Sequence, residues 1–452
     1  MSGNLPDDLF RSVLFTDLYE LAMGQAYLAE QMDQQAVFEL SFRRMPAGRN
    51  YLVAAGLDDV LDYLEHLRVT ENDLAYLREK LHFTDSFLER LRHFRFTGDV
   101  LAIPEGTPVF PGEPLVQVVA PIFEAQLLET FVLNQVHLQT LAASKAARVI
   151  TAAAGRQVIE FGARRAHGTD AALKVARCSY LVGAAGTSLV LAGKIYGIPL
   201  FGTMAHSYIQ AHKDEAGAFA EFARMYPQTT LLVDTYDTLQ GVQKVIDLGR
   251  TLGNAFRVHA VRLDSGDIGA LAKQTRAMLD RAGLQHVQIF ASSELDEYEI
   301  ARLIQSAAPI DAFGVGTRLA VIQDAPHIDM AYKLVEYAGE PRMKLSADKI
   351  VYPGRKQVFR KSENGRIVGD TVGRYEEKLE GELLLQVVMR AGKRLPAGNV
   401  SLEDARRYAI DQNKRLPEWL LSLDQSETPY PVAISEGLSL ELDSVRQLLR
   451  PG

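Results

Sequence analysis

Six segments of the chain place acidic, hydroxyl, arginine or glycine residues directly after short runs of β-favouring residues. In a parallel α/β barrel the carboxyl ends of the strands meet at one rim, and that rim carries the reactive groups. One such segment alone is typical of an ordinary turn, whereas six in the same register predict a shared site. The segments are QVIEF-GARRAHGTD (157–170), IPLFG-TMAHS (198–207), TTLLV-DTYDT (229–238), RVHAVRL-DSGD (257–267), HVQIFA-SSELDE (286–297) and IDAFGV-GTRLA (310–320).

The DSGD segment places two carboxylates, Asp264 and Asp267, around a small turn at a strand end. Carboxylate oxygens in such a turn suit a divalent cation such as Mg²⁺ or the hydroxyls of a sugar. A competing interpretation is that Ser265 or Asp267 caps the helix expected at 268–281. The two roles are compatible.

Arg262 precedes Asp264 by two residues, so along a strand the side chains of these two residues point to the same face. An arginine on the inner face of a barrel is costly unless it meets an anion. We therefore expect Arg262 to bind a carboxylate. A structural ion pair with Asp264 is the alternative.

Two further strand ends suit a phosphate. GVGT, with Gly314, Gly316 and Thr317, is a glycine-flanked turn that opens onto a helical turn and offers backbone amides and a hydroxyl. Ser292 and Ser293 form a similar cluster and are expected to share the same phosphate. Each motif alone is also typical of a plain turn or helix cap.

His206 lies just past a strand, where a histidine serves as a nucleophile, a general acid/base, a metal ligand or a buried hydrogen-bonded residue. No second histidine stands at metal-ligand spacing, which disfavours a metal. His212 is expected at the surface, and the role of His167 stays open. Cys178, inside a helical pattern with no adjacent base, is interpreted as a small buried residue.

The composition bounds the class of protein. The chain has 452 residues, a formal net charge of -8 and a single cysteine. The length predicts two domains, or a large barrel with an appendage. The acidic balance argues against nucleic-acid binding, and one cysteine excludes an internal disulfide framework. The sequence shows no signal peptide and no apolar run long enough to span a membrane, so a cytoplasmic protein without membrane contact is expected.

The wider pattern predicts the elements that position these loops. Strands alternate with helices expected at 170–195, 214–225, 237–252, 267–282 and 294–307, which implies parallel pairing in an irregular α/β barrel or an open sheet. Around it we expect a smaller α+β domain. Its elements are a helix at 16–32, a strand at 36–42, helices within 56–93, a β-rich segment at 96–120, a helical stretch at 121–154, and a β-rich return after 330 with a helix near 401–412. The expected domains are 1–140, joined by part of 340–452; the barrel, 141–340; and a C-terminal segment, 341–452.

Several motifs together resemble the nicotinate phosphoribosyltransferase family over about residues 13–365. The most specific are EFG-x-RR, GT-x-AHS and R-x-DSGD, in that order. They are joined by FTDLYELAMGQAYL, FELSFRRMP, GRNYLVAAGL, VDTYDT, FGVGT and YPGRKQVFR. Residues 370–452 carry no informative motif.

The resemblance implies a type II phosphoribosyltransferase that joins nicotinate to phosphoribosyl pyrophosphate (PRPP) in NAD salvage and forms nicotinate mononucleotide. It implies that ATP phosphorylates His206, that Mg²⁺ takes part, and that the enzyme is a homodimer with shared sites. Tyr19, reaching over from the neighbouring subunit, and Phe161 match the residues that sandwich the pyridine ring. The remaining matches are Thr203 and Arg262 for nicotinate, and Arg164, Asp264, Ser292 and Thr317 for PRPP.

Ser188 aligns with the aspartate that nicotinamide-using relatives carry, and serine does not repel a carboxylate. Nicotinate is therefore the expected substrate. Quinolinate phosphoribosyltransferase is the runner-up, although the GTMAHS loop and the length argue against it. A non-catalytic homologue and a barrel aldolase or isomerase are further alternatives. The last would need a strand-end lysine, whereas Lys174 and Lys194 fall in helical patterns.

Overall fold

A computed structural model of the protein describes residues 11–345 and 351–449. The chain divides into a terminal unit, Met1–Leu141 with His327–Gly452, and a central unit, Ala142–Pro326. The second division comes before the limit expected near 340. The reason is that β12 (Met330–Tyr337) pairs antiparallel with β1 (Gln35–Phe42), which ties this strand to the terminal unit.

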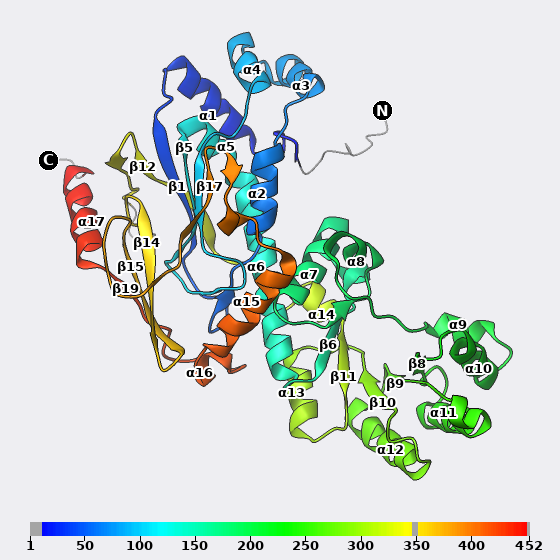
Figure 1. The fold of residues 1–452 in the computed structure, drawn as a ribbon. Helices are drawn as coiled ribbons and strands as arrows, with labels where there is room; N and C mark the ends of the chain where they lie inside the picture. Colours follow the sequence, from blue (N-terminus) through cyan, green and yellow to red (C-terminus); the bar gives the residue numbers. More distant parts are fainter. Residues whose placement is uncertain (1–10, 346–350, 450–452) are drawn as a thin grey trace. The chain divides into compact units, whose positions relative to one another are not determined.

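The central unit contains a six-stranded, all-parallel sheet in the order β7-β6-β11-β10-β9-β8, which curls into a half-barrel (Figure 1). The predicted mixed α/β class with a parallel sheet is therefore confirmed. Short apolar strands suit such a sheet because both of its faces are covered. The strands are β6 (Gln157–Glu160), β7 (Gly186–Thr187), β8 (Thr230–Leu232), β9 (Ala260–Leu263), β10 (Gln288–Ala291) and β11 (Ala312–Val315).

Helices follow the strands, and α11, α12 and α13 succeed one another along one side of the sheet in Figure 1. Asp237, Asp267 and Asp296 cap these three helices by accepting the backbone N–H three residues on. Such caps satisfy donors that have no partner within the helix. The helices of this unit are α7 (Thr169–Leu181), α8 (Val190–Tyr196), α9 (His206–Ala211), α10 (Glu215–Met225), α11 (Thr238–Leu252), α12 (Ile268–Arg281), α13 (Glu297–Gln305) and α14 (Thr317–Ala320).

Two predictions in this unit are wrong. The helix expected at 170–195 is interrupted by β7, and the strand expected at 198–202 is reduced to one bridge between Thr187 and Leu200. Gly186 explains the interruption, since a Cβ there would lie 2.2 Å from the carbonyl oxygen of Pro199. Only glycine permits this close approach of two backbones.

The terminal unit is built on a seven-stranded sheet, β13-β12-β1-β5-β3-β17-β18, with a four-stranded sheet, β16-β14-β15-β19, and the pair β2-β4. Its further strands are β2 (Leu52–Val53), β3 (Asp99–Ala102), β4 (Pro108–Val109), β5 (Pro114–Pro121), β13 (Glu340–Pro341), β14 (Lys356–Glu363), β15 (Arg366–Arg374), β16 (Glu382–Leu383), β17 (Gln386–Arg390), β18 (Lys393–Arg394) and β19 (Val432–Ile434). The β-rich segment at 96–120 and the β-rich return after 330 are thus confirmed.

The helices of the terminal unit agree in type with the sequence pattern. The stretch 56–93 contains three helices because Thr70 and Thr84 each start a new one by capping it. The helices are α1 (Leu18–Ala29), α2 (Leu57–His66), α3 (Glu71–Leu81), α4 (Asp85–Arg92), α5 (Ile122–Leu127), α15 (Leu402–Lys414), α16 (Glu418–Leu421) and α17 (Glu436–Leu449). The division between the two units falls within a further helix, α6 (Glu129–Ala152). In the described part of the chain, none of the helices has the length and apolar character needed to cross a bilayer.

Candidate active site

His206 stands at the start of α9, on the side of the sheet where the strands end. Its Nδ1 lies 3.1 Å from the Thr235 hydroxyl oxygen, and its Nε2 lies 3.6 Å from Oδ2 of Asp264. The imidazole is 41% exposed, so a solute can reach it. One ring nitrogen is thus held by a hydroxyl, and the other faces a carboxylate.

Arg262 extends from β9 toward the same place. Its Nη1 donates to the Thr203 hydroxyl at 2.8 Å, and its Nη2 lies 3.9 Å from Oδ2 of Asp264. Burial lowers the pKa of the guanidinium and the charge of Arg164 adds to this, whereas Asp264 and Asp234 oppose it. Within the described residues, the buried Nε of Arg262 has no hydrogen-bond partner.

The alternative role of Arg262, an ion pair with Asp264, is therefore present but long, and the guanidinium keeps donor capacity. A buried arginine that is only partly paired suits an incoming anion.

Asp234, two residues after the end of β8, organises the DSGD loop. Its Oδ2 accepts the backbone N–H of Asp264 at 3.0 Å and the Ser265 hydroxyl at 2.7 Å. The other oxygen, Oδ1, is buried and has no hydrogen-bond partner among the described residues. Sequence analysis named the DTYDT loop but gave Asp234 no role. A carboxylate directly after a strand was the available signal.

Asp267 and Asp264 have different surroundings. Oδ1 of Asp267 accepts the backbone N–H of Ala270 at 3.1 Å, so the helix-cap alternative is confirmed. Asp264 receives a hydrogen bond from the buried Ser292 hydroxyl. In residues 11–345 and 351–449, no group of three or more His, Cys, Asp or Glu residues has a metal-binding arrangement. A cation at this edge of the sheet would have two carboxylates, those of Asp234 and Asp264, and would need oxygens of the substrate as further ligands.

Phe161 directly follows β6, and its backbone N–H donates to the Val315 carbonyl at 2.8 Å. Its ring lies 5.7 Å from that of Phe290, centroid to centroid. A Cβ on Gly314 would lie 2.7 Å from the Phe161 ring, and a Cβ on Gly316 would lie 3.3 Å from the Phe161 carbonyl. Gly314 therefore makes room for the ring, and the expected phosphate role of GVGT is left to Gly316 and Thr317, where α14 begins.

Sequence analysis missed Glu160, which is fully buried at the end of β6. Its carboxylate accepts the backbone N–H of Gly162 and, at 2.6 Å, the Thr187 hydroxyl. Burial raises the pKa of Glu160, and these two hydrogen bonds oppose that rise. Ser188, the residue after Thr187, is exposed. Its backbone N–H donates to the Glu160 carbonyl at 3.0 Å. Glu160 thereby fixes the loop that presents Ser188.

Other predicted site residues lie at the margin of this network. Arg164 sits in the turn Ala163–Arg165 and is close enough to Arg262 for its charge to act there. Ser293 is exposed and has φ of +130°, a strained backbone for a residue other than glycine. Tyr19 belongs to α1 of the terminal unit and is 47% exposed. Hydrogen bonds and contacts between charged groups thus join Thr203, His206, Arg262, Asp264 and Ser292.

The residues to which the sequence gave no catalytic role fit that assignment. Cys178 is buried in α7. Lys174 and Lys194 lie on helices, as expected, rather than at strand ends. Nδ1 of His212 lies 2.8 Å from the Tyr208 carbonyl, one turn earlier.

Comparison with known sequences decides the family. Residues 14–137 match the model described as the nicotinate phosphoribosyltransferase N-terminal domain, and residues 156–352 match that of the nicotinate phosphoribosyltransferase family. The chain is 59% identical over 433 residues to a nicotinate phosphoribosyltransferase of Mycobacterium tuberculosis, covering 96% of this chain and 94% of that one. The chain belongs to the nicotinate phosphoribosyltransferase family. A member from Bacillus subtilis is 41% identical, over 83% of this chain and 78% of its own.

Solved structures agree with this membership. Human nicotinic acid phosphoribosyltransferase superposes with a TM-score of 0.85 at 29% identity, covering 95% of this chain and 99% of that one. A nicotinate-nucleotide pyrophosphorylase from Pyrococcus furiosus superposes with a TM-score of 0.74 at 25% identity, covering 92% and 98%. The similarity therefore extends over both units and includes the C-terminal segment that carried no sequence motif.

Proposed function

We propose that this chain converts nicotinate and PRPP into nicotinate mononucleotide and pyrophosphate in NAD biosynthesis, coupled to ATP hydrolysis through a phosphohistidine at His206. Family membership supports the transferase reaction. The observation that carries the proposal is the contact network of Thr203, His206, Arg262 and Asp264 at one edge of the parallel sheet.

The substrate is a flat ring with one carboxylate, which needs a stacking surface and a guanidinium. Phe161 offers a ring face, and Arg262, oriented by Thr203, offers the guanidinium. As pyrophosphate leaves the ribose, positive charge develops at the anomeric carbon, and the pyridine nitrogen attacks it. We assign to Asp264 the stabilisation of that charge or the binding of the ribose hydroxyls, because its carboxylate faces His206 and Arg262. Arg164, Ser292, Ser293, Gly316 and Thr317 remain the candidates for the phosphates, whereas Gly314 makes room for the Phe161 ring.

Mg²⁺ is part of the proposal, and carboxylate oxygens suit it. Asp264 stays a candidate ligand. Asp234 joins it because its buried Oδ1 has no hydrogen-bond partner in the described part of the chain. Asp267 is the weaker of the two original candidates, since one of its oxygens already caps α12. The ion would neutralise charge on the departing pyrophosphate.

The phosphohistidine step uses both ring nitrogens of His206. If Nδ1–H donates to Thr235, the Nε2 lone pair is free to attack the γ-phosphorus of ATP. The N–P bond forms as the bond to ADP breaks, and water later releases phosphate. The added phosphoryl group brings roughly two negative charges close to Asp264. Its formation and loss would therefore change the affinity of the site for the anionic substrates.

The proposal also includes a homodimer with shared sites, in which the exposed Tyr19 covers the ring in the partner's site, and a cytoplasmic location. Mixing Tyr19→Ala and Arg262→Ala chains tests the shared site. Regained activity in the mixture supports it, because one site would then hold both intact residues. Activity no higher than that of the separate variants contradicts it.

The transferase reaction is tested by incubating the chain with nicotinate, PRPP and Mg²⁺, with and without ATP, and measuring nicotinate mononucleotide. Product that depends on PRPP and rises with ATP supports the whole proposal. PRPP-dependent product that does not respond to ATP retains the transferase and removes the coupling. No product under either condition contradicts the function.

The phosphohistidine is tested separately with γ-labelled ATP, followed by mapping of acid-labile phosphate. His206→Ala should lose the label and the ATP stimulation. His212→Ala is the matched control, because His212 lies just after the same helix, and it should keep both. Label elsewhere, or none, contradicts the step.

A further inference from the structure

Glu160 lies at the end of β6, which runs between β7 and β11 in the parallel sheet. In the pairing of β6 with β7, Glu160 stands opposite Thr187. Phe161 and Ser188 come next on the two strands, and the Ser188 N–H continues the ladder by donating to the Glu160 carbonyl at 3.0 Å. Consecutive residues of a strand point to opposite faces. Glu160 and Thr187 therefore share one face of the sheet, whereas the residues after them share the face that carries the Phe161 ring.

The Glu160 carboxylate joins two loops at this edge of the sheet. One oxygen accepts the backbone N–H of Gly162, in the turn that follows β6. The other oxygen accepts the Thr187 hydroxyl at 2.6 Å, and that hydroxyl oxygen in turn accepts the Leu189 N–H at 3.0 Å. Both neighbours of Ser188 are thus connected to the Glu160 side chain, while Ser188 itself is held by the Glu160 carbonyl.

This carboxylate is buried without a counter-ion. In the described part of the chain, no cationic side chain compensates it: burial raises the pKa of Glu160, and the hydrogen bonds from Thr187 and Gly162 oppose that rise. Burying a carboxylate without a counter-ion costs stability. A group that costs stability while it fixes two loops beside one face is typical of a functional site rather than of the scaffold alone.

We propose that Glu160, acting through Thr187, is a positioning residue for the pyridine substrate and fixes the Ser188 loop beside the Phe161 ring. The inference rests on the proposed nicotinate site. Because Glu160 is fully buried on the opposite face, it acts on the substrate only through these loops. Without the Thr187 contact, backbone bonds alone hold the loop, so nicotinate should bind more weakly while PRPP, at the other strand ends, should not.

The contact is tested by Thr187→Val, which removes the hydroxyl and keeps the shape of the side chain. Titration calorimetry of the full chain with nicotinate should give a dissociation constant about tenfold higher than that of wild type, as expected for the loss of one hydrogen bond to a charged group. The KM for PRPP should change by less than about twofold. Thr187→Ser, which restores the hydroxyl, should return the nicotinate affinity to within about threefold of wild type.

The carboxylate itself is tested by Glu160→Gln, which keeps a carbonyl oxygen for the Gly162 N–H and weakens the contact with Thr187. Both changes act on one contact. The double variant Glu160→Gln, Thr187→Val should therefore raise the dissociation constant by less than the product of the two single effects. Single effects that multiply in full overturn the proposed action through Thr187.

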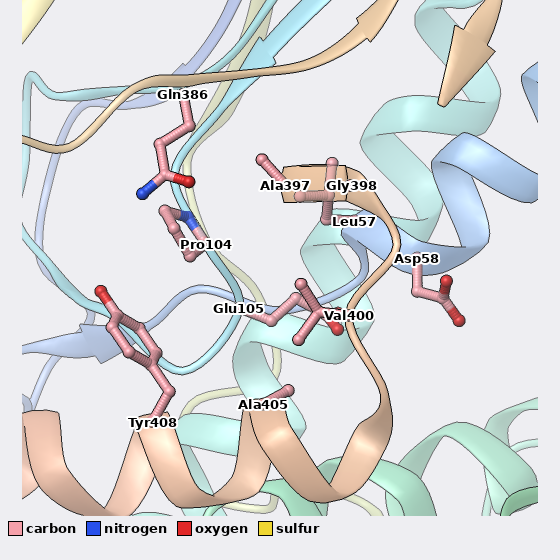
Figure 2. Close-up of a pocket in the computed structure, with 10 residues that line it drawn as sticks. All are labelled: Leu57, Asp58, Pro104, Glu105, Gln386, Ala397, Gly398, Val400, Ala405 and Tyr408. Carbon is pink, nitrogen blue, oxygen red and sulfur yellow. The ribbon is translucent and has the colours of Figure 1, made fainter. Parts of the chain in front are cut away.

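Two controls separate positioning from stability. Thr275→Val makes the same change at a threonine of α12 whose buried hydroxyl has no hydrogen-bond partner in the described residues. Tyr408→Phe removes a hydroxyl contact, 3.2 Å to Thr107, beside a pocket of about 220 Å³ in the terminal unit, which Figure 2 shows. Both controls should bind nicotinate like wild type, and thermal melting measures the stability that each change costs.

The outcomes are distinct. Nicotinate affinity that is unchanged in Thr187→Val, not restored in Thr187→Ser, or lowered equally in Tyr408→Phe overturns the positioning role. A wild-type chain that does not bind nicotinate overturns this role together with the proposed function. A wild-type chain that binds nicotinate without forming the mononucleotide contradicts the transferase reaction alone, and the affinities of the variants still decide the positioning role.

Discussion

The Ser292 hydroxyl donates a hydrogen bond to Oδ1 of Asp264, and the other oxygen of that carboxylate faces His206 at 3.6 Å. Ser292 therefore orients the carboxylate that the histidine meets. Ser292 directly follows β10 and is buried, which restricts its side chain in this contact.

Ser292→Ala should lower kcat/KM for PRPP by about tenfold, since one hydrogen bond to a charged group is lost. Steady-state kinetics at saturating nicotinate measure this. Ser306→Ala is the matched control, because this serine is exposed at the end of α13 and has no role in the proposed site. Equal losses in the two variants would show that the Ser292 contact has no special role.

Ser188→Asp should reverse the preference for the acid. The exposed Ser188 is held by the backbone bond to Glu160, so an aspartate there would meet the substrate without rearranging the loop. A carboxylate at this position repels nicotinate and accepts a bond from an amide. The ratio of kcat/KM for nicotinate to that for nicotinamide should fall by at least about tenfold. If wild type already prefers nicotinamide, the substrate assignment is wrong.

Lys145→Met should destabilise the central unit. Glu297 is fully buried between the Lys145 ammonium at 2.5 Å and the Arg148 guanidinium at 3.0 Å, and Lys145 also contacts Asp324. Removing one cation leaves buried negative charge, at a cost of about 3–5 kcal/mol in the free energy of unfolding. Denaturant unfolding measures it. The double variant Lys145→Met, Glu297→Leu should recover much of the loss, and a double variant no better than the single one would argue against this explanation.

Glu20 should make stability depend on pH. Burial, with the charges of Glu129 and Asp17 adding to it, raises the pKa of Glu20 to about 8, although Thr130 donates to its carboxylate. The folded chain thus binds a proton more tightly than the unfolded chain. The stabilisation is present in full below the unfolded pKa near 4.5 and is lost as pH rises through about 8.

Glu20→Gln should remove this dependence. Between pH 6 and pH 9 the wild-type melting temperature should fall more than that of the variant, by an amount corresponding to about 1–2 kcal/mol. Parallel melting curves across that range would contradict the linkage.

The local sequence pattern predicted the helices and strands of the central unit where apolar and polar residues repeat with a clear period. The helices at 214–225, 237–252 and 267–282 agree with α10, α11 and α12 to within a residue, because Asp caps mark the starts of all three. The stretch 170–195 was misread since its composition is helical. A close backbone approach at Gly186, which involves Pro199, decides the outcome there.

The candidate site was predictable to the extent that its residues follow strands directly. Asp264 directly follows β9 and Arg262 lies within it, whereas His206 follows a segment that forms only one bridge; the three nevertheless come together. Asp234 and Glu160 act on backbone amides and hydroxyls of other loops, and such contacts depend on strand order, which local patterns do not reveal.

The central claim is that Arg262, oriented by Thr203, receives the carboxylate of nicotinate at the edge of the parallel sheet. The most direct measurement is kcat/KM for nicotinate in wild type and in Arg262→Gln, with PRPP and ATP saturating. The account predicts product from wild type and a loss of at least about 100-fold in the variant, mainly through KM, because a charged hydrogen-bonding partner is removed. Absence of product with the wild-type chain, or an Arg262→Gln variant as efficient as wild type, would contradict it.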